Sequence, residues 1–199
     1  MAKDLSKPDL VVAVFGAGTM GRGIAQVCAQ AGITTLLSDA LPGAVEKAIA
    51  SIDKALDGQV SKGRMTAEAK QGTLSRLREF KSFDEAASAG VVIEAIVENL
   101  EAKRELFREM EKRIAPDAVL ASNTSSLSVT EISVATGRPS KVVGMHWFNP
   151  APVLKLVEIP EERPFKVNGL SVRAIRVSHS VPTTGFVVED KSGTLAYSS

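Results

Sequence analysis

One of the two histidines in this chain stands where an imidazole could move a proton. His146 lies in the apolar stretch GMHWFNPAPVLKLVE, and Glu158 ends that stretch. A neutral imidazole is suited to accept a hydroxyl proton near pH 7, and a carboxylate can orient the ring and stabilise its protonated form. If 141–147 and 153–159 are two strands joined by the Asn-Pro turn, their ends need not be adjacent. The sequence therefore leaves the pairing of His146 with Glu158 open.

Two serines follow another apolar segment. Ser125 and Ser126, in AVLASNTSSLS, come just after a predicted strand at 117–122. Ligands of open α/β sheets bind at the carboxyl ends of the strands, so these hydroxyls are candidates for substrate contacts. Each of these candidates also has a structural alternative: a satisfied core histidine, a surface glutamate, and hydroxyls that cap a helix at 127–136.

A glycine-rich loop near the N-terminus predicts the binding of a dinucleotide. The sequence GAGTMGRG follows an apolar run at 9–15 and opens a helical segment. In that context the first glycine permits a tight turn, the second lets the backbone approach a pyrophosphate, and the third allows close helix packing. The alternative is a glycine turn that binds nothing. The predicted cofactor contacts are Gly16, Gly18, Thr19, Met20 and Gly21.

An acidic residue follows the glycine loop at the spacing expected for ribose binding. Asp39 ends the second apolar run, ITTLLSD, about twenty residues after the loop, where a carboxylate accepts hydrogen bonds from an adenosine ribose. A carboxylate at this position would repel a 2′-phosphate, so NAD is favoured over NADP. The alternative is a surface aspartate after a strand.

The elements that must position these residues alternate between strand and helix. This alternation predicts an α/β fold with a Rossmann-type, doubly wound and mostly parallel sheet. Two helices follow the second strand where one crossover helix would suffice, which predicts a helical-hairpin insertion. Strands are expected at 9–15, 33–39, 91–97, 117–122 and 141–147, and helices at 23–32, 41–57, 66–79, 100–114 and 127–136.

Composition favours a protein of the cytoplasm that binds neither nucleic acid nor membrane. The formal net charge of +1 gives no global field to attract polyanions. The single Cys28 cannot form an internal disulfide, and no apolar run resembles a signal peptide or a membrane span. No metal site is predicted. The expected domains are an N-terminal extension at 1–8, a dinucleotide-binding domain at 9–190 with a helical arm at about 41–79 and a divergent tail at 160–190, and a C-terminal stub at 191–199.

Four stretches in this order resemble the NAD-binding domain of the 3-hydroxyacyl-CoA dehydrogenases of fatty acid β-oxidation and butanoate metabolism. They are GAGTMGRGIAQVCAQAG, IEAIVENLEAKRELF, ASNTSSLSVTEI and GMHWFNPAPVLKLVEI, within residues 9–159. The resemblance implies NAD-dependent oxidation of an (S)-3-hydroxyacyl-CoA to the 3-oxoacyl-CoA, or the reverse reduction. It implies that His146 is the general base, that Glu158 is its electrostatic partner, and that Ser125 and Asn149 contact substrate and nicotinamide.

The resemblance also implies further binding residues. Glu98 and Lys103 would touch the cofactor, and the helical hairpin at 41–79 resembles the family's arm that lies against coenzyme A. Lys62 and Arg64, in the turn of that hairpin, are candidates for contacts with the CoA phosphates. The alternative is a solvated basic turn.

The resemblance ends near residue 160. In the family a helical domain follows, which forms the dimer and one wall of the acyl site, and this sequence is expected to lack it. Aligning the tail with the segment that leads into that domain places Glu189 or Tyr197 where an active-site asparagine belongs, and the distance from Glu158 favours Tyr197. The substrate site is therefore expected to need a homo-oligomer or a separate helical-domain partner.

Two other classes of function stay open. One is a non-catalytic NAD-binding or assembly module, and the other is a dehydrogenase of another hydroxy-acid class. The motifs HWFNP and SNTSSLS argue against the second. Substituting His146 by Gln separates an enzyme from a module, since only an enzyme loses activity.

Overall fold

The computed structural model describes residues 9–154 and 157–159, together with the backbone of strands between 165 and 197. The chain divides into two compact units, Met1–Leu156 and Val157–Ser199. The sequence had predicted one dinucleotide-binding domain that continues to residue 190. In the structure the parallel sheet belongs to the first unit alone.

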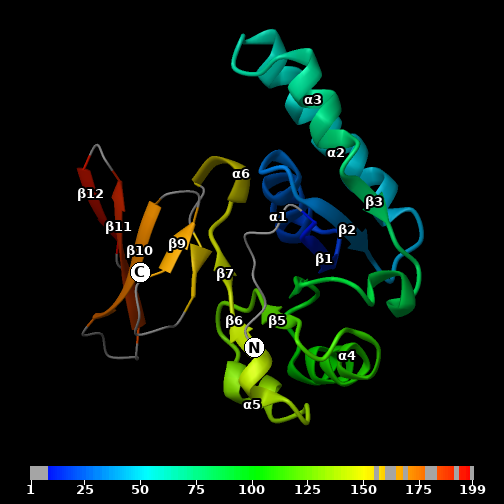
Figure 1. Cartoon of the computed structure of the whole chain (residues 1–199), viewed down its shortest axis with the longest axis vertical. Helices are drawn as coiled ribbons and strands as arrows, with labels where there is room; N and C mark the ends of the chain where they lie inside the picture. The colour runs from blue at the N-terminus through cyan, green and yellow to red at the C-terminus, as the bar shows by residue number, and fades with distance from the viewer. Residues whose placement is uncertain are drawn as a thin grey trace. The chain divides into compact units, whose positions relative to one another are not determined.

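The first unit is built on six parallel strands in the order β3-β2-β1-β4-β5-β6 (Figure 1). Every neighbouring pair in this sheet runs parallel. This order reverses between β1 and β4, as in doubly wound dinucleotide-binding folds, and it confirms the predicted Rossmann-type architecture. The strands are β1 (Val11–Phe15), β2 (Thr34–Ser38), β3 (Leu77–Glu79), β4 (Val91–Glu94), β5 (Val119–Ser122) and β6 (Val142–Gly144).

Helices connect these strands nearly where the sequence predicts them. The predicted helix at 66–79 is wrong in its last turn, because Leu77–Glu79 forms β3 instead. A parallel ladder with β2 satisfies the backbone groups of these residues, and Leu77 becomes buried. The helices of the first unit are α1 (Thr19–Gln30), α2 (Ala44–Ser61), α3 (Ala67–Leu74), α4 (Leu100–Arg113), α5 (Val129–Ser133) and α6 (Ala151–Leu154), with short 3-10 helices η1 (Phe83–Ala86) and η2 (Pro139–Lys141).

Helices cover both faces of the sheet because successive strand side chains point to opposite sides. In β1, Ala13 and Phe15 belong to a buried cluster that also contains Phe107 of α4. Val14, between them, lies against α1, where a Cβ added at Gly21 would lie 3.4 Å from its side chain. Cys28 also packs on the buried side of α1. Burial outweighs a backbone hydrogen bond and raises the pKa of the Cys28 thiol to about 12, so this cysteine acts as a packed apolar group.

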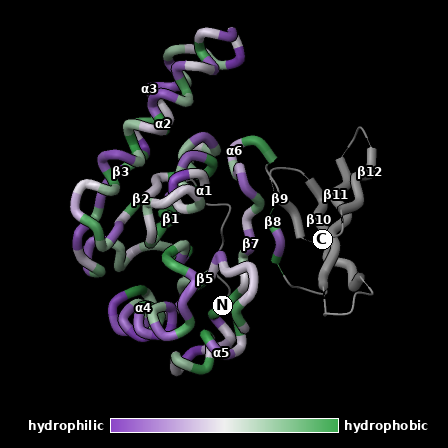
Figure 2. Tube along the Cα trace, turned by 180° about the vertical axis from the view of Figure 1, so that it is seen from behind, coloured by the Kyte–Doolittle hydropathy of each residue, from purple (hydrophilic) through white to green (hydrophobic). Residues whose placement is uncertain are grey.

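The predicted helical insertion is present. Helices α2 and α3 form a hairpin that projects from the sheet, and hydrophilic and hydrophobic residues alternate along it (Figures 1 and 2). Lys70 of α3 joins the two helices, since its Nζ lies 2.6 Å from Asp53 and 2.5 Å from Asp57 of α2. The Thr66 hydroxyl accepts a hydrogen bond from the Ala69 N–H and caps α3.

The last predicted strand of the first unit is divided. Residues 141–147 form β6 and a short β7 (His146–Trp147), and the expected strand at 153–159 is wrong at its start. A helix occupies that position because Pro150 precedes α6 and its carbonyl accepts hydrogen bonds from the Val153 and Leu154 N–H groups. In the part of the chain that the structure describes, no helix combines the length and apolar character needed to cross a membrane.

The second unit begins with β8 (Val157–Glu158) and contains an antiparallel sheet. Its order is β12-β11-β10-β9, formed by the strands β9 (Phe165–Val167), β10 (Leu170–Val177), β11 (Thr183–Asp190) and β12 (Gly193–Tyr197). Glu189 lies in β11 and Tyr197 in β12, and their side chains lie outside the described part of the chain. The sequence after residue 160 has neither a clear helical face nor a clean alternation, so it did not indicate which elements form there.

Phe107 tests the packing between α4 and the sheet. Phe107→Ala should lower the free energy of unfolding by about 3–5 kcal/mol, because this fully buried ring would leave a cavity. Urea denaturation followed by circular dichroism measures the change. Leu41→Ala is the control, since Leu41 is 71% exposed and should change stability by less than about 0.5 kcal/mol. Equal losses in the two variants would contradict the packing described.

Candidate functional site

The glycine loop between β1 and α1 has two positions that accept no side chain. Gly16 has a left-handed φ of 103°, and a Cβ added there would lie 2.4 Å from the Ala95 carbonyl oxygen. A Cβ at Gly21 would lie 1.7 Å from the Gly16 carbonyl oxygen. These glycines therefore hold the loop tightly against α1 and against the residues that follow β4.

Gly18, in contrast, faces open space. It is the N-cap of α1, and a Cβ added there meets no heavy atom within 4 Å. No side chain caps this end of α1, and its first turn contains no acidic residue. The exposed Thr19 and half-buried Met20 open the helix. Backbone N–H groups and the helix dipole at such an end attract anions, so this loop fits the pyrophosphate of a dinucleotide.

Asp39 holds the glycine loop in place. Its carboxylate accepts hydrogen bonds from the Ala17 N–H at 2.7 Å and from the Leu41 N–H at 2.9 Å. The Gly16 N–H also donates to the Ser38 carbonyl at the end of β2. The structure thus assigns Asp39 a role in shaping the loop, while its contact with an adenosine ribose stays a prediction.

The loop lies at the point where the strand order reverses. Strands β1 and β4 are neighbours, and the Ala95 N–H donates to the Phe15 carbonyl across them. Dinucleotides bind across such a switch point, outside the carboxyl ends of the strands. The ribose contact predicted for Asp39 would put the adenosine on the β2 side and the nicotinamide half over the ends of β4, β5 and β6.

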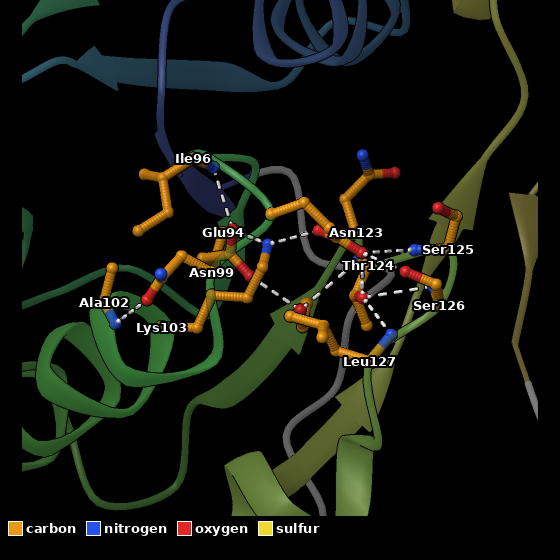
Figure 3. Close-up of polar contacts among 12 residues, drawn as sticks. Glu94, Ile96, Asn99, Ala102, Lys103, Asn123, Thr124, Ser125, Ser126 and Leu127 are labelled. Atoms are coloured by element: carbon orange, nitrogen blue, oxygen red, sulfur yellow. Dashed lines mark hydrogen bonds and ion pairs between the residues drawn. The ribbon is translucent and has the colours of Figure 1, made fainter.

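A buried ion pair joins α4 to the end of β4. Lys103, on α4, is 1% exposed, and its Nζ lies 2.5 Å from Glu94 Oε1 at the end of β4 and 3.1 Å from Glu98 Oε2 (Figure 3). Glu94 also accepts hydrogen bonds from the Ile96 N–H at 2.8 Å and from the Ser122 hydroxyl at 2.6 Å. Lys103 was predicted to touch the cofactor, and the structure places its ammonium between two glutamates.

Glu98 connects this ion pair to the turn after β5. It accepts hydrogen bonds from the Thr124 and Ser126 hydroxyls and from the Ser125 N–H. Burial disfavours the charged carboxylate, but the hydrogen bonds from Thr124 and Lys103 and the charge of Lys103 outweigh it and lower the pKa of Glu98 to about 2. Figure 3 shows the turn of Thr124, Ser125 and Ser126 beside this network, with the backbone nitrogen of Ser125 directed toward it.

The alternative role of the serines as helix caps does not hold for Ser125 and Ser126. The hydroxyl that caps α5 belongs to Ser128, which accepts from the Glu131 N–H at 3.2 Å. Ser125 is exposed, and its backbone is held by Glu98. Its side chain therefore stands at the carboxyl edge of the sheet, where the sequence predicted a substrate contact.

His146 is brought to the same edge. The Met145 N–H donates to the Ser122 carbonyl, and the Trp147 N–H donates to Asn123 Oδ1 at 2.9 Å. These two bonds fix the backbone on both sides of His146 against the end of β5. The half-buried His146 ring lies 4.8 Å from the ring of Phe148, measured between centroids.

The turn after His146 is placed by α6. Asn149 is exposed and precedes a cis peptide bond to Pro150, and α6 follows directly. Helix α6 packs on α1 at Gly23, where an added Cβ would lie 3.3 Å from Pro152 and 3.4 Å from Ala151. The absence of a side chain at Gly23 thus permits the segment that carries Asn149 to approach the helix that begins at the glycine loop.

Three predicted residues lie away from this edge or in the second unit. Glu158 is half-buried in β8 of the second unit, and its pairing with His146 stays a prediction. Lys62 and Arg64 are exposed in the turn between α2 and α3, which is compatible with a solvated turn and with phosphate binding alike.

Sequence reasoning missed Glu94, Asn123 and Thr124. A glutamate at the end of the apolar strand VVIE was the available signal for Glu94, since such a position is buried and needs a cation. Lys103, nine residues later on the inner side of α4, supplies it. Asn123 and Thr124 are the first polar residues after β5, and their position at the strand end could have identified them.

The low pKa of Glu98 predicts how its contribution to stability depends on pH. The unfolded carboxyl titrates near 4.5 and the folded one near 2, so the unfolded state binds more protons between these values. The stabilisation is therefore complete above about pH 4.5 and is lost as the pH falls toward 2. Glu98→Gln should lower the urea midpoint at pH 7, and the difference from wild type should shrink at about pH 3.5. A difference that grows on acidification would contradict the assignment.

Known proteins match the first unit and continue beyond it. The family model for the NAD-binding domain of 3-hydroxyacyl-CoA dehydrogenase matches residues 11–164. A probable 3-hydroxybutyryl-CoA dehydrogenase of Bacillus subtilis is 43% identical over 74% of this chain and 52% of its own length. A 3-hydroxybutyryl-CoA dehydrogenase of Clostridioides difficile is 41% identical over 74% of this chain and 53% of its own length. This chain thus spans about half the length of these relatives.

Solved structures give the same result. A 3-hydroxybutyryl-CoA dehydrogenase of Escherichia coli aligns with a TM-score of 0.74 and 44% identity, over 75% of this chain and 32% of its own. An (S)-3-hydroxybutyryl-CoA dehydrogenase of Ralstonia eutropha aligns with a TM-score of 0.73 and 38% identity, over 75% of this chain and 53% of its own. The matches confirm NAD as the cofactor that the glycine loop predicts. The chain belongs to the 3-hydroxyacyl-CoA dehydrogenase family and corresponds to the NAD-binding domain of its members.

Proposed function

We propose that this chain supplies the NAD-binding part of an enzyme that interconverts (S)-3-hydroxyacyl-CoA and 3-oxoacyl-CoA. One observation carries the proposal: the glycine loop and the segments of Ser125 and His146 lie along one sheet edge, on the two sides of the switch point. Relatives named for hydroxybutyryl-CoA and hydroxyadipyl-CoA support the thioester class rather than one chain length.

The chemistry assigned to the chain's own residues is proton transfer and positioning. His146 accepts the proton of the 3-hydroxyl group as the C–H bond breaks and the carbonyl forms. Glu158 orients the imidazole and stabilises its protonated form, while Ser125 and Asn149 hydrogen-bond around the reacting carbon. Bound NAD supplies the acceptor for the hydride. In the reverse direction His146 returns its proton to the new hydroxyl.

We also propose contacts with coenzyme A, a helical domain that completes the acyl site, and a cellular compartment. Lys62 and Arg64, in the turn of the α2–α3 hairpin, are assigned to the phosphates of coenzyme A. Because the relatives are about twice as long as the matched region, we assign the missing wall of the acyl site to a helical domain in a longer chain, a second copy or a separate protein. The enzyme is proposed to work in the cytoplasm.

Substitutions at two glycines distinguish an effect on cofactor binding from an effect on folding. Gly18→Ala should leave the thermal midpoint nearly unchanged, since the new methyl group meets no protein atom within 4 Å. It should weaken NADH binding by about tenfold or more, because the methyl group stands where the pyrophosphate approaches the backbone. Gly21→Ala is the matched comparison and should destabilise the fold, since its Cβ would overlap the Gly16 carbonyl. Wild-type NADH affinity in a folded Gly18→Ala chain would contradict the cofactor position.

The activity itself is tested by titrating the chain with NADH, then adding acetoacetyl-CoA and following the NADH absorbance. We expect NADH to be oxidised, either by the chain alone or after a relative's helical domain is added. His146→Gln should lower turnover by roughly 10²–10⁴-fold while NADH affinity stays close to wild type. Turnover that survives this substitution would refute the base assignment. NADH binding without turnover in either setting would instead support a non-catalytic NAD-binding module.

A further inference from the structure

The charge of the cofactor changes during the proposed reaction, because the nicotinamide ring is positive in NAD⁺ and neutral in NADH. A fixed charge beside the ring therefore alters the relative affinity for the two forms. We infer that Glu98 presents an uncompensated negative charge to the nicotinamide side of the site and shifts binding toward the oxidised cofactor. This inference rests on the proposed function. It adds Glu98 as a residue that sets the relative affinity of the site for NAD⁺ and NADH.

The buried network holds more negative than positive charge. It contains two carboxylates, Glu94 and Glu98, and one ammonium, Lys103. The Lys103 Nζ lies closer to Glu94, at 2.5 Å, than to Glu98, at 3.1 Å. Glu94 and Lys103 are almost completely buried, whereas the Glu98 side chain is 38% exposed. The ammonium therefore neutralises the inner carboxylate, and the remaining negative charge lies on the outer one.

Glu98 has three partners besides Lys103 among the described residues. They are the hydroxyls of Thr124 and Ser126 and the backbone N–H of Ser125, all of them neutral donors. Neutral donors favour the ionised carboxylate without cancelling its charge at a distance. The pKa of about 2 agrees with this, since Glu98 stays ionised throughout the neutral range.

Glu98 lies in the loop after β4, beside the switch point of the sheet. Its loop begins at Ala95, which touches Gly16 of the glycine loop, and it faces the turn of Ser125 after β5. Asp39 lies on the opposite side of the switch point, after β2. A dinucleotide that crosses the switch point with its adenosine toward Asp39 brings its nicotinamide toward Glu98.

A purely structural role for Glu98 makes a different prediction. If Glu98 only held the β5–α5 turn in place, its loss would weaken both cofactor forms by the same factor. A charge effect changes the ratio of the two dissociation constants instead. The ratio of the two dissociation constants therefore distinguishes a charge effect of Glu98 from a purely structural role.

The test measures the Kd of NAD⁺ and of NADH for the wild-type chain and for Glu98→Gln by fluorescence and calorimetry. The ratio Kd(NAD⁺)/Kd(NADH) should rise about three- to tenfold in the variant, the range that Coulomb's law gives for one charge within roughly 10 Å in a partly solvated site. Glu98→Asp keeps the charge and should keep the wild-type ratio even where both affinities fall. Glu98→Ala removes the charge without placing an amide beside Lys103, and it should reproduce the shift.

The matched control is Glu109→Gln. Glu109 lies in the last part of α4, and its carboxylate pairs with Lys112 at 2.6 Å. The substitution removes the same charge as Glu98→Gln, but at a position away from the sheet edge. Its ratio should equal that of wild type. An unchanged ratio in Glu98→Gln and Glu98→Ala, or the same shift in Glu109→Gln, would overturn the inference alone. Failure of the wild-type chain to bind either cofactor would overturn the proposed function on which it rests.

Discussion

The buried pair of Lys103 and Glu94 is the interaction on which the candidate site depends. Two charges removed from water are tolerated only when they meet each other and when their remaining bonding positions are satisfied. Here the Ile96 N–H and the Ser122 hydroxyl complete the shell of Glu94, so that one carboxylate joins β4, the loop after it, α4 and β5. Loss of either charged partner would leave an unpaired charge inside the protein, so the placement of these segments depends on the pair.

Hydrogen bonds and an ion pair link this pair to the residues at the edge of the sheet. Lys103 positions Glu98, Glu98 holds the turn of Ser125, and Asn123 at the start of this turn holds the backbone beside His146. Each step is a hydrogen bond or an ion pair, and such contacts reduce the conformational entropy that the linked residues lose when a substrate binds. On the other side of the switch point, Asp39 does the same for the glycine loop through the Ala17 N–H. Because a carboxylate has about four acceptor positions, the bonds from the Ala17 and Leu41 N–H groups leave Asp39 able to accept from a ribose as well.

The sequence predicted the fold well because the strands are apolar runs and the loop glycines are spaced for one specific turn. It failed at Leu77–Glu79, where the residues continue a helical pattern and only the neighbouring β2 explains their extended backbone. The cofactor contact of Lys103, which the resemblance implies, stays a prediction, but its burial between two glutamates was not foreseen, because lysine side chains are rarely buried unless they are paired. The pairing of Glu94 with Lys103 depends on how α4 lies against β4, and sequence spacing does not contain that information. The relation of Glu158 to His146 is of the same kind, because it depends on tertiary placement rather than on local pattern.

Two carboxylates around one ammonium achieve what a single ion pair could not. A lone Glu98–Lys103 pair would hold the β5–α5 turn equally well, but its opposite charges would largely cancel at the distance of a bound ring. With Glu94 as the inner partner, the charge of the Lys103 ammonium is neutralised by Glu94. The ammonium still lies close enough to Glu98 to fix the position of the Glu98 carboxylate. Neutral donors from the turn then keep Glu98 ionised. Under the proposed function, Glu94 therefore has two roles, since it joins the buried segments and leaves the negative charge of Glu98 to act on the cofactor.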